Sequence, residues 1–220
     1  MDKKFLGIYR QTKDFTMTGT ERMYALYKAV KYIIKSNVPG DIVECGVWKG
    51  GSCMVAALTL KTMSSTSKKL YLYDTYKGMT KPGKIDSGAV EKWREENYAD
   101  TDFWGIAPLD EARKNLYATG YPKNNFVFIQ GPVETTIPAP STPKKIALLR
   151  LDTDWYQSTY HELTYLYPRL VKGGVIIIDD YGHWPGARKA CDKYFKVNNI
   201  NILLNRIDYT GRIGIKTKIG

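Results

Sequence analysis

Two apolar runs that each end in aspartates constrain the fold of this chain most. The run LRLDTDWY covers residues 149–156, and VIIIDDYG covers residues 175–182. Their Leu, Ile and Val residues lack polar alternation, which predicts strands buried on both faces, as in a parallel sheet. Open α/β sheets bind ligands in the crevice beyond the carboxyl ends of their strands. The two runs therefore predict four carboxylates at one crevice: Asp152, Asp154, Asp179 and Asp180.

The clustered aspartates predict a site for a hard divalent metal ion. Crowded carboxylates repel one another and shift each other's pKa unless protons or a cation intervene. All-oxygen ligands favour Mg²⁺, Mn²⁺ or Ca²⁺ over zinc, and the chain has two histidines, His161 and His183, to serve softer metals. Asp179 and Asp180 are adjacent, so both reach one ion only where the strand ends, as the Tyr-Gly pair that follows indicates. One of the four aspartates could instead cap a following helix.

Length and composition indicate one ordinary globular domain. The chain has 220 residues, 43% hydrophobic and 25% charged, which is enough for a large core. No apolar run approaches the ~20 residues that span a bilayer, and the N-terminus lacks a signal-peptide core. We therefore expect a cytoplasmic protein without membrane association. The three cysteines form no Cys-x-x-Cys pair, which argues against a disulfide framework or a zinc finger.

The formal net charge of +11 has two interpretations. Lysines are scattered along the whole chain, which favours a solvated surface over a nucleic-acid footprint. A basic nucleic-acid-binding protein stays open as an alternative of another class, with steeply salt-dependent binding as its signature. We expect no nucleic-acid partner, whereas an anionic substrate such as a sugar nucleotide or an acidic glycan is compatible with the charge.

Predicted strands and helices alternate along the chain. Residues 1–40 form an N-terminal helical extension or lid whose helix begins near a cap at Thr18 or Thr20, and residues 41–220 form the main domain. Alternation implies a doubly wound, mostly parallel sheet, and the last 20 residues suggest an antiparallel hairpin. This is the outline of the Rossmann-like, seven-stranded class I methyltransferase fold. The expected strands lie near 41–45, 69–74, 125–131, 144–152 and 175–180. Helices are expected at 51–63, between 89 and 119, at 156–171 and at 185–195. The segments 75–92 and 132–143 are candidates for a lid or an insertion.

The segment VECGVWKGGS resembles a ligand-binding turn between a strand and a helix. Its glycines allow close approach to the backbone, and the helix N-terminus offers amide donors to a carboxylate or phosphate. The spacing fits neither the dinucleotide fingerprint nor the Walker A loop, and a plain βα turn stays open. Glu44 would pair with an ammonium group. Asp74 ends the next strand, where an acidic residue binds ribose hydroxyls, although it could instead cap the loop that follows. Together these features describe an amino-acid nucleoside such as S-adenosylmethionine.

Several long segments resemble the macrocin O-methyltransferase family. They are FTMTGTERMYALYKAV, ECGVWKGGS, LYDTYKGM, LRLDTDWYQST and GGVIIIDDYGHWPGARKA, in family order over nearly the whole chain. The resemblance implies an enzyme that uses S-adenosylmethionine and Mg²⁺ (or Mn²⁺) to methylate a hydroxyl of a sugar or glycosylated small molecule, such as a natural product or a glycan precursor. A metal-dependent catechol-type O-methyltransferase is the alternative within the same chemistry. We also expect a homo-oligomer, a dimer or larger.

The resemblance also implies roles for individual residues. Asp154 is the expected general base, with His183 as runner-up. The expected metal ligands are Asp152, Asp179 and Asp180, and the expected cofactor contacts are Met17, Glu44, Gly46, Ser52, Asp74, Gln130 and Gly131.

Overall fold

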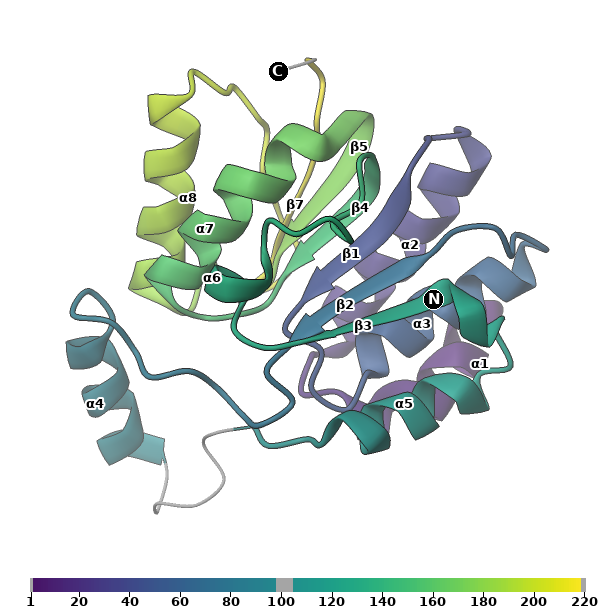
Figure 1. Ribbon diagram of the computed structural model, residues 1–220, viewed down its shortest axis with the longest axis horizontal. Coiled ribbons are helices and arrows are strands. Elements are labelled where there is room, and N and C mark those ends of the chain that lie inside the picture. The colour runs from purple at the N-terminus through teal and green to yellow at the C-terminus, as the bar shows by residue number, and fades with distance from the viewer. Residues whose placement is uncertain (1, 98–104, 219–220) are drawn as a thin grey trace.

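The computed structural model describes residues 2–97 and 105–218, which form one mixed sheet with helices on both of its faces (Figure 1). Within these residues the sheet has seven strands in the order β3-β2-β1-β4-β5-β7-β6. The strands are β1 (Asp41–Cys45), β2 (Leu70–Asp74), β3 (Phe126–Gln130), β4 (Ile146–Leu151), β5 (Leu170–Ile178), β6 (Asn205–Arg206) and β7 (Arg212–Ile215).

The first five strands are parallel, and β7 is antiparallel to both β5 and β6. The predicted parallel sheet with a C-terminal antiparallel hairpin is therefore confirmed. The hairpin is shorter than the sequence suggested, because residues 200–204 run outside the ladder even though Ile202 and Leu204 pack against the core. Leu203 between them is 77% exposed, so its apolar character reflects no burial.

The helices divide between the two faces of the sheet (Figure 1). One face carries α1 (Lys3–Thr12), α2 (Thr20–Lys35), α3 (Gly51–Thr62) and α5 (Leu109–Ala118), and the other carries α6 (Val133–Thr136), α7 (Tyr156–Leu166) and α8 (Pro185–Val197). Helix α4 (Ser87–Asn97) protrudes at the edge of the molecule, and its Val90 packs in a cluster with Trp155, Trp184 and Ala187. The described residues also include short 3₁₀ turns at Lys13–Phe15 (η1), Lys123–Asn125 (η2) and Tyr167–Arg169 (η3).

The predicted cap of α2 is wrong. Gly19 precedes the first turn and supplies no side-chain cap, and Thr20 is already helical. The Thr18 hydroxyl instead accepts a hydrogen bond of 3.1 Å from Arg150, on a strand of the sheet. A tertiary contact has therefore taken the group that local sequence assigned to the helix.

The core lies on both faces of the central strands, which explains their lack of alternation. On one face, Phe5 and Met23 of the N-terminal helices pack in the same cluster as Val55 and Leu148. The N-terminal 40 residues thus share the main hydrophobic core. On the other face, Leu149 and Ile176 pack in a cluster with Leu163 of α7 and Cys191 of α8.

The burial of the cysteines and the length of the helices bear on two further expectations. Cys45, Cys53 and Cys191 are buried free thiols. Among the described residues, no helix combines the length and apolar character needed to cross a membrane.

Gly46 determines how closely the end of β1 approaches the end of β4. Its φ is +84°, and a Cβ built there would lie 1.9 Å from the carbonyl oxygen of Asp152. Only glycine fits this backbone and this contact. The close approach sets the glycine turn directly against the carboxylates that follow β4.

Candidate active site

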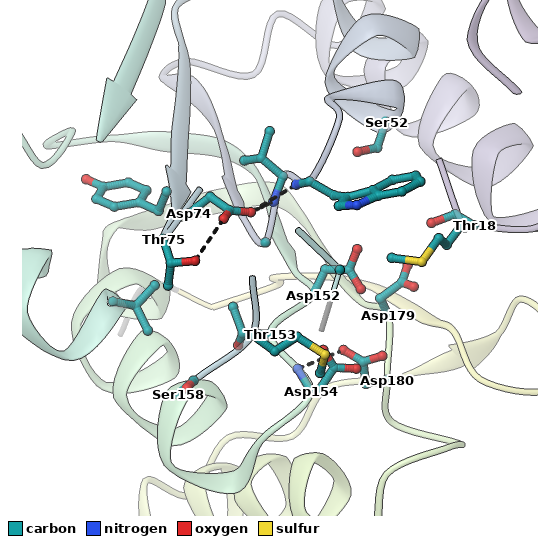
Figure 2. A pocket seen from close by; sticks show the side chains of 18 of the residues that line it. Thr18, Ser52, Asp74, Thr75, Asp152, Thr153, Asp154, Ser158, Asp179 and Asp180 are labelled. Atoms are coloured by element: carbon teal, nitrogen blue, oxygen red, sulfur yellow. Dashed lines mark hydrogen bonds between the residues drawn. The ribbon is translucent and has the colours of Figure 1, made fainter. Parts of the chain in front are cut away.

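A cavity of about 530 Å³ opens at the carboxyl ends of the parallel strands. Figure 2 shows Asp152, Asp154, Asp179 and Asp180 gathered on one side of it and Asp74 on the other. Of the predicted site residues, Glu44 and Gln130 are not among those lining this cavity. The predicted residues that do line it are Met17, Gly46, Ser52, Asp74, Gly131, Asp152, Asp154, Asp179, Asp180 and His183.

Asp152, Asp179 and Asp180 form a compact cluster of oxygen ligands. Each offers one carboxylate oxygen, and these atoms all lie within 4.8 Å of one another. Strand β5 ends at Ile178, so the two adjacent aspartates are free of the strand's alternation. Burial raises the pKa of Asp152 and of Asp180 well above the usual range, and the neighbouring carboxylate charges raise both further. A donor set made of carboxylate oxygens alone suits Mg²⁺ or Mn²⁺.

A buried arginine, Arg150, connects these carboxylates to the first strand. Its Nη1 lies 2.6 Å from Glu44 Oε1 and 2.7 Å from Asp152 Oδ2, and its Nη2 lies 2.6 Å from Asp179 Oδ1. Sequence reasoning missed this residue. The sequence contained a signal for it: an arginine inside the apolar run LLRL can be buried only if anionic groups accept hydrogen bonds from its guanidinium.

A second arginine that the sequence reasoning missed, Arg22 on α2, reaches the same cluster. Its Nη1 donates to Asp179 Oδ2, and its Nε donates to Asp208 at 2.9 Å. Arg22 thereby ties the N-terminal helices to the C-terminal hairpin, and both oxygens of Asp179 accept from guanidinium groups. No local pattern predicts this contact, because the two partners are 157 positions apart.

Asp154 points into the cavity from a left-handed turn with φ of +66°. Its Oδ1 accepts a 2.7 Å hydrogen bond from the indole of Trp184, and its backbone amide donates to Asp180 Oδ2 at 3.2 Å. Burial raises the pKa of Asp154 to about 6, against the effect of the Trp184 hydrogen bond. Asp154 is thus a carboxylate held in place next to the cluster of Asp152, Asp179 and Asp180.

The alternative role of Asp154, as the cap of α7, belongs to another residue. The amide of Tyr156 donates to both oxygens of Asp86, at 3.1 and 3.3 Å. A Cβ at Gly186 of α8 would lie 1.7 Å from Asp86 Oδ1, so Asp86 also packs directly against the first turn of α8. Trp155 Nε1 adds a 2.8 Å bond to the carbonyl of Thr80. The predicted lid segment 75–92 is therefore anchored here, and it forms a wall of the cavity through Gly78, Met79 and Thr80.

His183 lines the same cavity as the three-aspartate cluster. Its Nδ1 lies 2.8 Å from the hydroxyl of Tyr209, and its ring packs edge-on against Trp184. Burial lowers the pKa of His183, and the positive charge of Arg22 lowers it further.

Asp74 braces the glycine turn from the neighbouring strand. Its Oδ2 accepts from the amides of Val47 and Trp48 at 2.6 and 2.9 Å, and its Oδ1 accepts from the amide of Tyr76 at 2.7 Å. Figure 2 shows this carboxylate at the cavity wall. The capping alternative is thus observed, and Asp74 faces the cavity as well.

Glu44 and Gln130 make contacts elsewhere. The Glu44 side chain is 3% exposed, and its carboxylate accepts from Ser52, Cys53 and Arg150. Gln130 is exposed and donates to the carbonyl of Thr75 at 3.4 Å.

Comparison with known proteins identifies the family. The family model for macrocin-O-methyltransferase (TylF) matches residues 2–213. The chain belongs to this family. A tetracenomycin-C 4'-O-methyltransferase from Streptomyces olivaceus, whose substrate is named 8-demethyl-8-(2,3-dimethoxy-alpha-L-rhamnosyl)-tetracenomycin-C, is 34% identical over 96% of this chain and 78% of its own length. The mycinamicin III 3''-O-methyltransferase of Micromonospora griseorubida is 31% identical over 89% of this chain and 76% of its own.

A solved O-methyltransferase structure shares the fold closely. The O-methyltransferase NovP superposes with a TM-score of 0.83 at 29% identity, over 93% of this chain and 83% of NovP. The predicted macrocin O-methyltransferase fold and family are therefore confirmed, and the chain is an O-methyltransferase of natural-product type.

Proposed function

We propose that this macrocin-type O-methyltransferase transfers a methyl group from S-adenosylmethionine to a sugar hydroxyl, with Mg²⁺ or Mn²⁺ in the site. The observation that carries the proposal is the three-aspartate cluster beside Asp154, across one cavity from the glycine turn and Asp74. Oxygen ligands, a nearby base and a nucleoside-type wall are the parts that metal-assisted methyl transfer to a hydroxyl requires.

The cofactor side of the cavity belongs to β1, α3 and β2. The amides at the start of α3 and the backbone of Gly46 suit the carboxylate of the amino-acid portion. Asp74 keeps acceptor lone pairs for the ribose hydroxyls while it braces the turn. Met17 is 69% exposed at the cavity edge and can cover the bound nucleoside.

The acceptor side belongs to the aspartates that follow β4 and β5. Asp152, Asp179 and Asp180 would hold the metal ion, which lowers the pKa of a bound hydroxyl and fixes its direction. Asp154 would take the proton of the acceptor hydroxyl, and the wall formed by Gly78, Met79 and Thr80 would exclude water from the reacting groups. Orientation of this kind contributes up to roughly 7–11 kcal/mol to catalysis.

A sugar acceptor is favoured over a catechol. The relative from Streptomyces olivaceus has a rhamnosyl-bearing substrate in its name. Activity on a vicinal-diol glycoside but not on a catechol is the expected result. Turnover of catechol at comparable rate would favour the alternative.

Binding of S-adenosylhomocysteine, measured by calorimetry, tests the cofactor assignment. We expect Asp74→Ala to weaken binding by about 1.5–3 kcal/mol, the contribution of hydrogen bonds to a charged group. Asp110→Ala, which removes a carboxylate 89% exposed on α5, is the matched control and should change nothing. Absence of binding by the wild type would contradict the cofactor assignment itself. Activity should also disappear with EDTA and return with Mg²⁺ or Mn²⁺.

A further inference from the structure

A basic groove lies along helix α8, beside the active-site cavity. Its walls include His183, which also lines the active-site cavity, so the two hollows adjoin at this residue. Four cationic side chains of α8 line it: Arg188, Lys189, Lys193 and Lys196. Among the described residues that line the groove, one is acidic, Asp192. The groove therefore carries a net positive charge next to the acceptor side of the site.

Among the described residues, no ion pair neutralises the cationic side chains of the groove. Asp192 accepts a 2.6 Å hydrogen bond from the hydroxyl of Tyr181. Arg188 uses only its Nε, which donates to the carbonyl of Tyr181 at 3.1 Å, while its guanidinium lies over the Tyr181 ring. Within the part of the chain that the structure describes, Lys189 and Lys196 form no ion pair. Lys193 keeps its charge while its Nζ lies 5.2 Å from the centroid of the Tyr160 ring.

The charge of the groove suits a phosphate better than a single carboxylate. A phosphate monoester carries about −1.5 to −2 charges at pH 7 and three acceptor oxygens, and Arg and Lys together supply fork-shaped and point-charge donors for them. With a rise of ~1.5 Å per helical residue, Lys189 and Lys193 lie about 6 and 12 Å along α8 from its first residue, Pro185. An anion held there would be a substituent beyond the acceptor ring, not the ring itself.

We infer that the α8 groove binds the phosphate or diphosphate of a phosphorylated acceptor sugar. The inference rests on the proposed function and narrows it: the acceptor is a sugar phosphate or a nucleoside diphosphate sugar. Clefts lined by charge of one sign also raise the local concentration of such substrates.

Calorimetry at low salt with inorganic pyrophosphate and with uridine diphosphate tests the groove. We expect Lys189→Glu/Lys193→Glu to weaken both by roughly tenfold or more, since two attractions become repulsions. Lys28→Glu/Lys114→Glu reverses two exposed lysines on α2 and α5, with the same change of net charge, and should have little effect. Tighter binding of uridine diphosphate than of pyrophosphate would identify the nucleotide-linked sugar; equal binding would identify the phosphate alone.

Several results would overturn the inference. The inference fails if pyrophosphate does not bind, or if both double variants lose the same amount of affinity for pyrophosphate. It also fails if glucuronate binds as tightly as pyrophosphate. A random oligonucleotide that binds far more tightly, through the same lysines, would assign the groove to nucleic acid instead. S-adenosylhomocysteine affinity and melting temperature are measured in each variant. The lysines of α8 do not line the active-site cavity. A failure of the proposed function would therefore appear as absent S-adenosylhomocysteine binding, whereas a failure of the groove would appear as absent pyrophosphate binding.

Discussion

Arg150 and Glu44 face each other across strands β4 and β1 as register partners, and their side chains form an ion pair in which each is 3% exposed. The same guanidinium reaches Asp152 and Asp179. One buried cation therefore joins the strand that leads into the glycine turn to the carboxylates of the three-aspartate cluster. The cofactor side and the acceptor side of the cavity share this residue.

Arg150→Leu should lower the free energy of unfolding by about 3–5 kcal/mol, because it leaves buried carboxylates without their cation. Urea denaturation measures the loss. Lys13→Met, which breaks an ion pair that is 53% and 77% exposed on its two sides, is the control and should cost less than about 1 kcal/mol. A similar small loss in Arg150→Leu would show that the carboxylates are neutral in the folded protein.

The sequence predicted the sheet and the aspartate cluster because both depend on local features. An apolar run such as Val-Ile-Ile-Ile at residues 175–178 predicts a buried parallel strand. The residues that follow such a run must lie at the carboxyl end of the strand. Arg150 was overlooked although its position inside such a run requires a buried partner. Arg22 and Asp86 could not be predicted, because their partners lie 157 and 70 positions away and depend on how helices and loops pack.

Glu44 and Asp74 show the limit of assigning roles from position. Both stand at strand ends where a ligand contact is plausible, and each is first used by the protein itself. Glu44 accepts from Arg150, a residue 106 positions later, while Asp74 holds the backbone of the turn. Position predicted which edge of the sheet carries them, and side-chain packing decided which of them reaches the cavity.

Arg22→Gln should raise the affinity for Mn²⁺ by about tenfold or more. Arg22 donates to Asp179 Oδ2, so its charge competes with a metal ion for that ligand. At an effective dielectric constant of ~20, a unit charge at ~5 Å contributes a few kcal/mol of repulsion toward another cation. Calorimetric titration with Mn²⁺ measures the effect, with Arg10→Gln on the exposed face of α1 as the control of equal charge. Weaker binding in Arg22→Gln would show that Arg22 orders the ligands instead.

Glu162→Gln should make the protein more stable at neutral and alkaline pH. Glu162 on α7 is fully buried, its Oε1 accepts from Thr153 at 2.9 Å, and its Oε2 has no partner in the described structure. Burial raises the pKa of Glu162 well above 4.5, and the charge of Glu134 raises it further. The amide of glutamine keeps the bond to Thr153 and carries no titrating proton.

The sign of this pH dependence follows from proton binding. Between pH 4.5 and the raised pKa, the folded protein keeps the Glu162 proton that the unfolded chain releases. Wild-type stability therefore falls as pH rises through this window, by up to about 1.4 kcal/mol per pH unit. Plots of melting temperature against pH for wild type and Glu162→Gln should run parallel below pH 4.5 and diverge above it. Parallel plots over the whole pH range would mean that Glu162 ionises at its ordinary pKa.

Asp154→Asn should lose methyl transfer while it keeps the fold and the cofactor. Asparagine tolerates the left-handed backbone at φ of +66° and can still accept from Trp184, so the turn should survive. Loss of a general base typically costs ~10²–10⁴-fold in rate. The capping explanation for Asp154 is excluded by Asp86, whose two oxygens accept from the amide of Tyr156, the first residue of α7. His183→Gln serves as the matched comparison, because His183 lines the same cavity and bonds Tyr209. Single-turnover rate, S-adenosylhomocysteine affinity and melting temperature are measured for both variants. If His183→Gln loses the methyl-transfer rate and Asp154→Asn does not, the general base is His183.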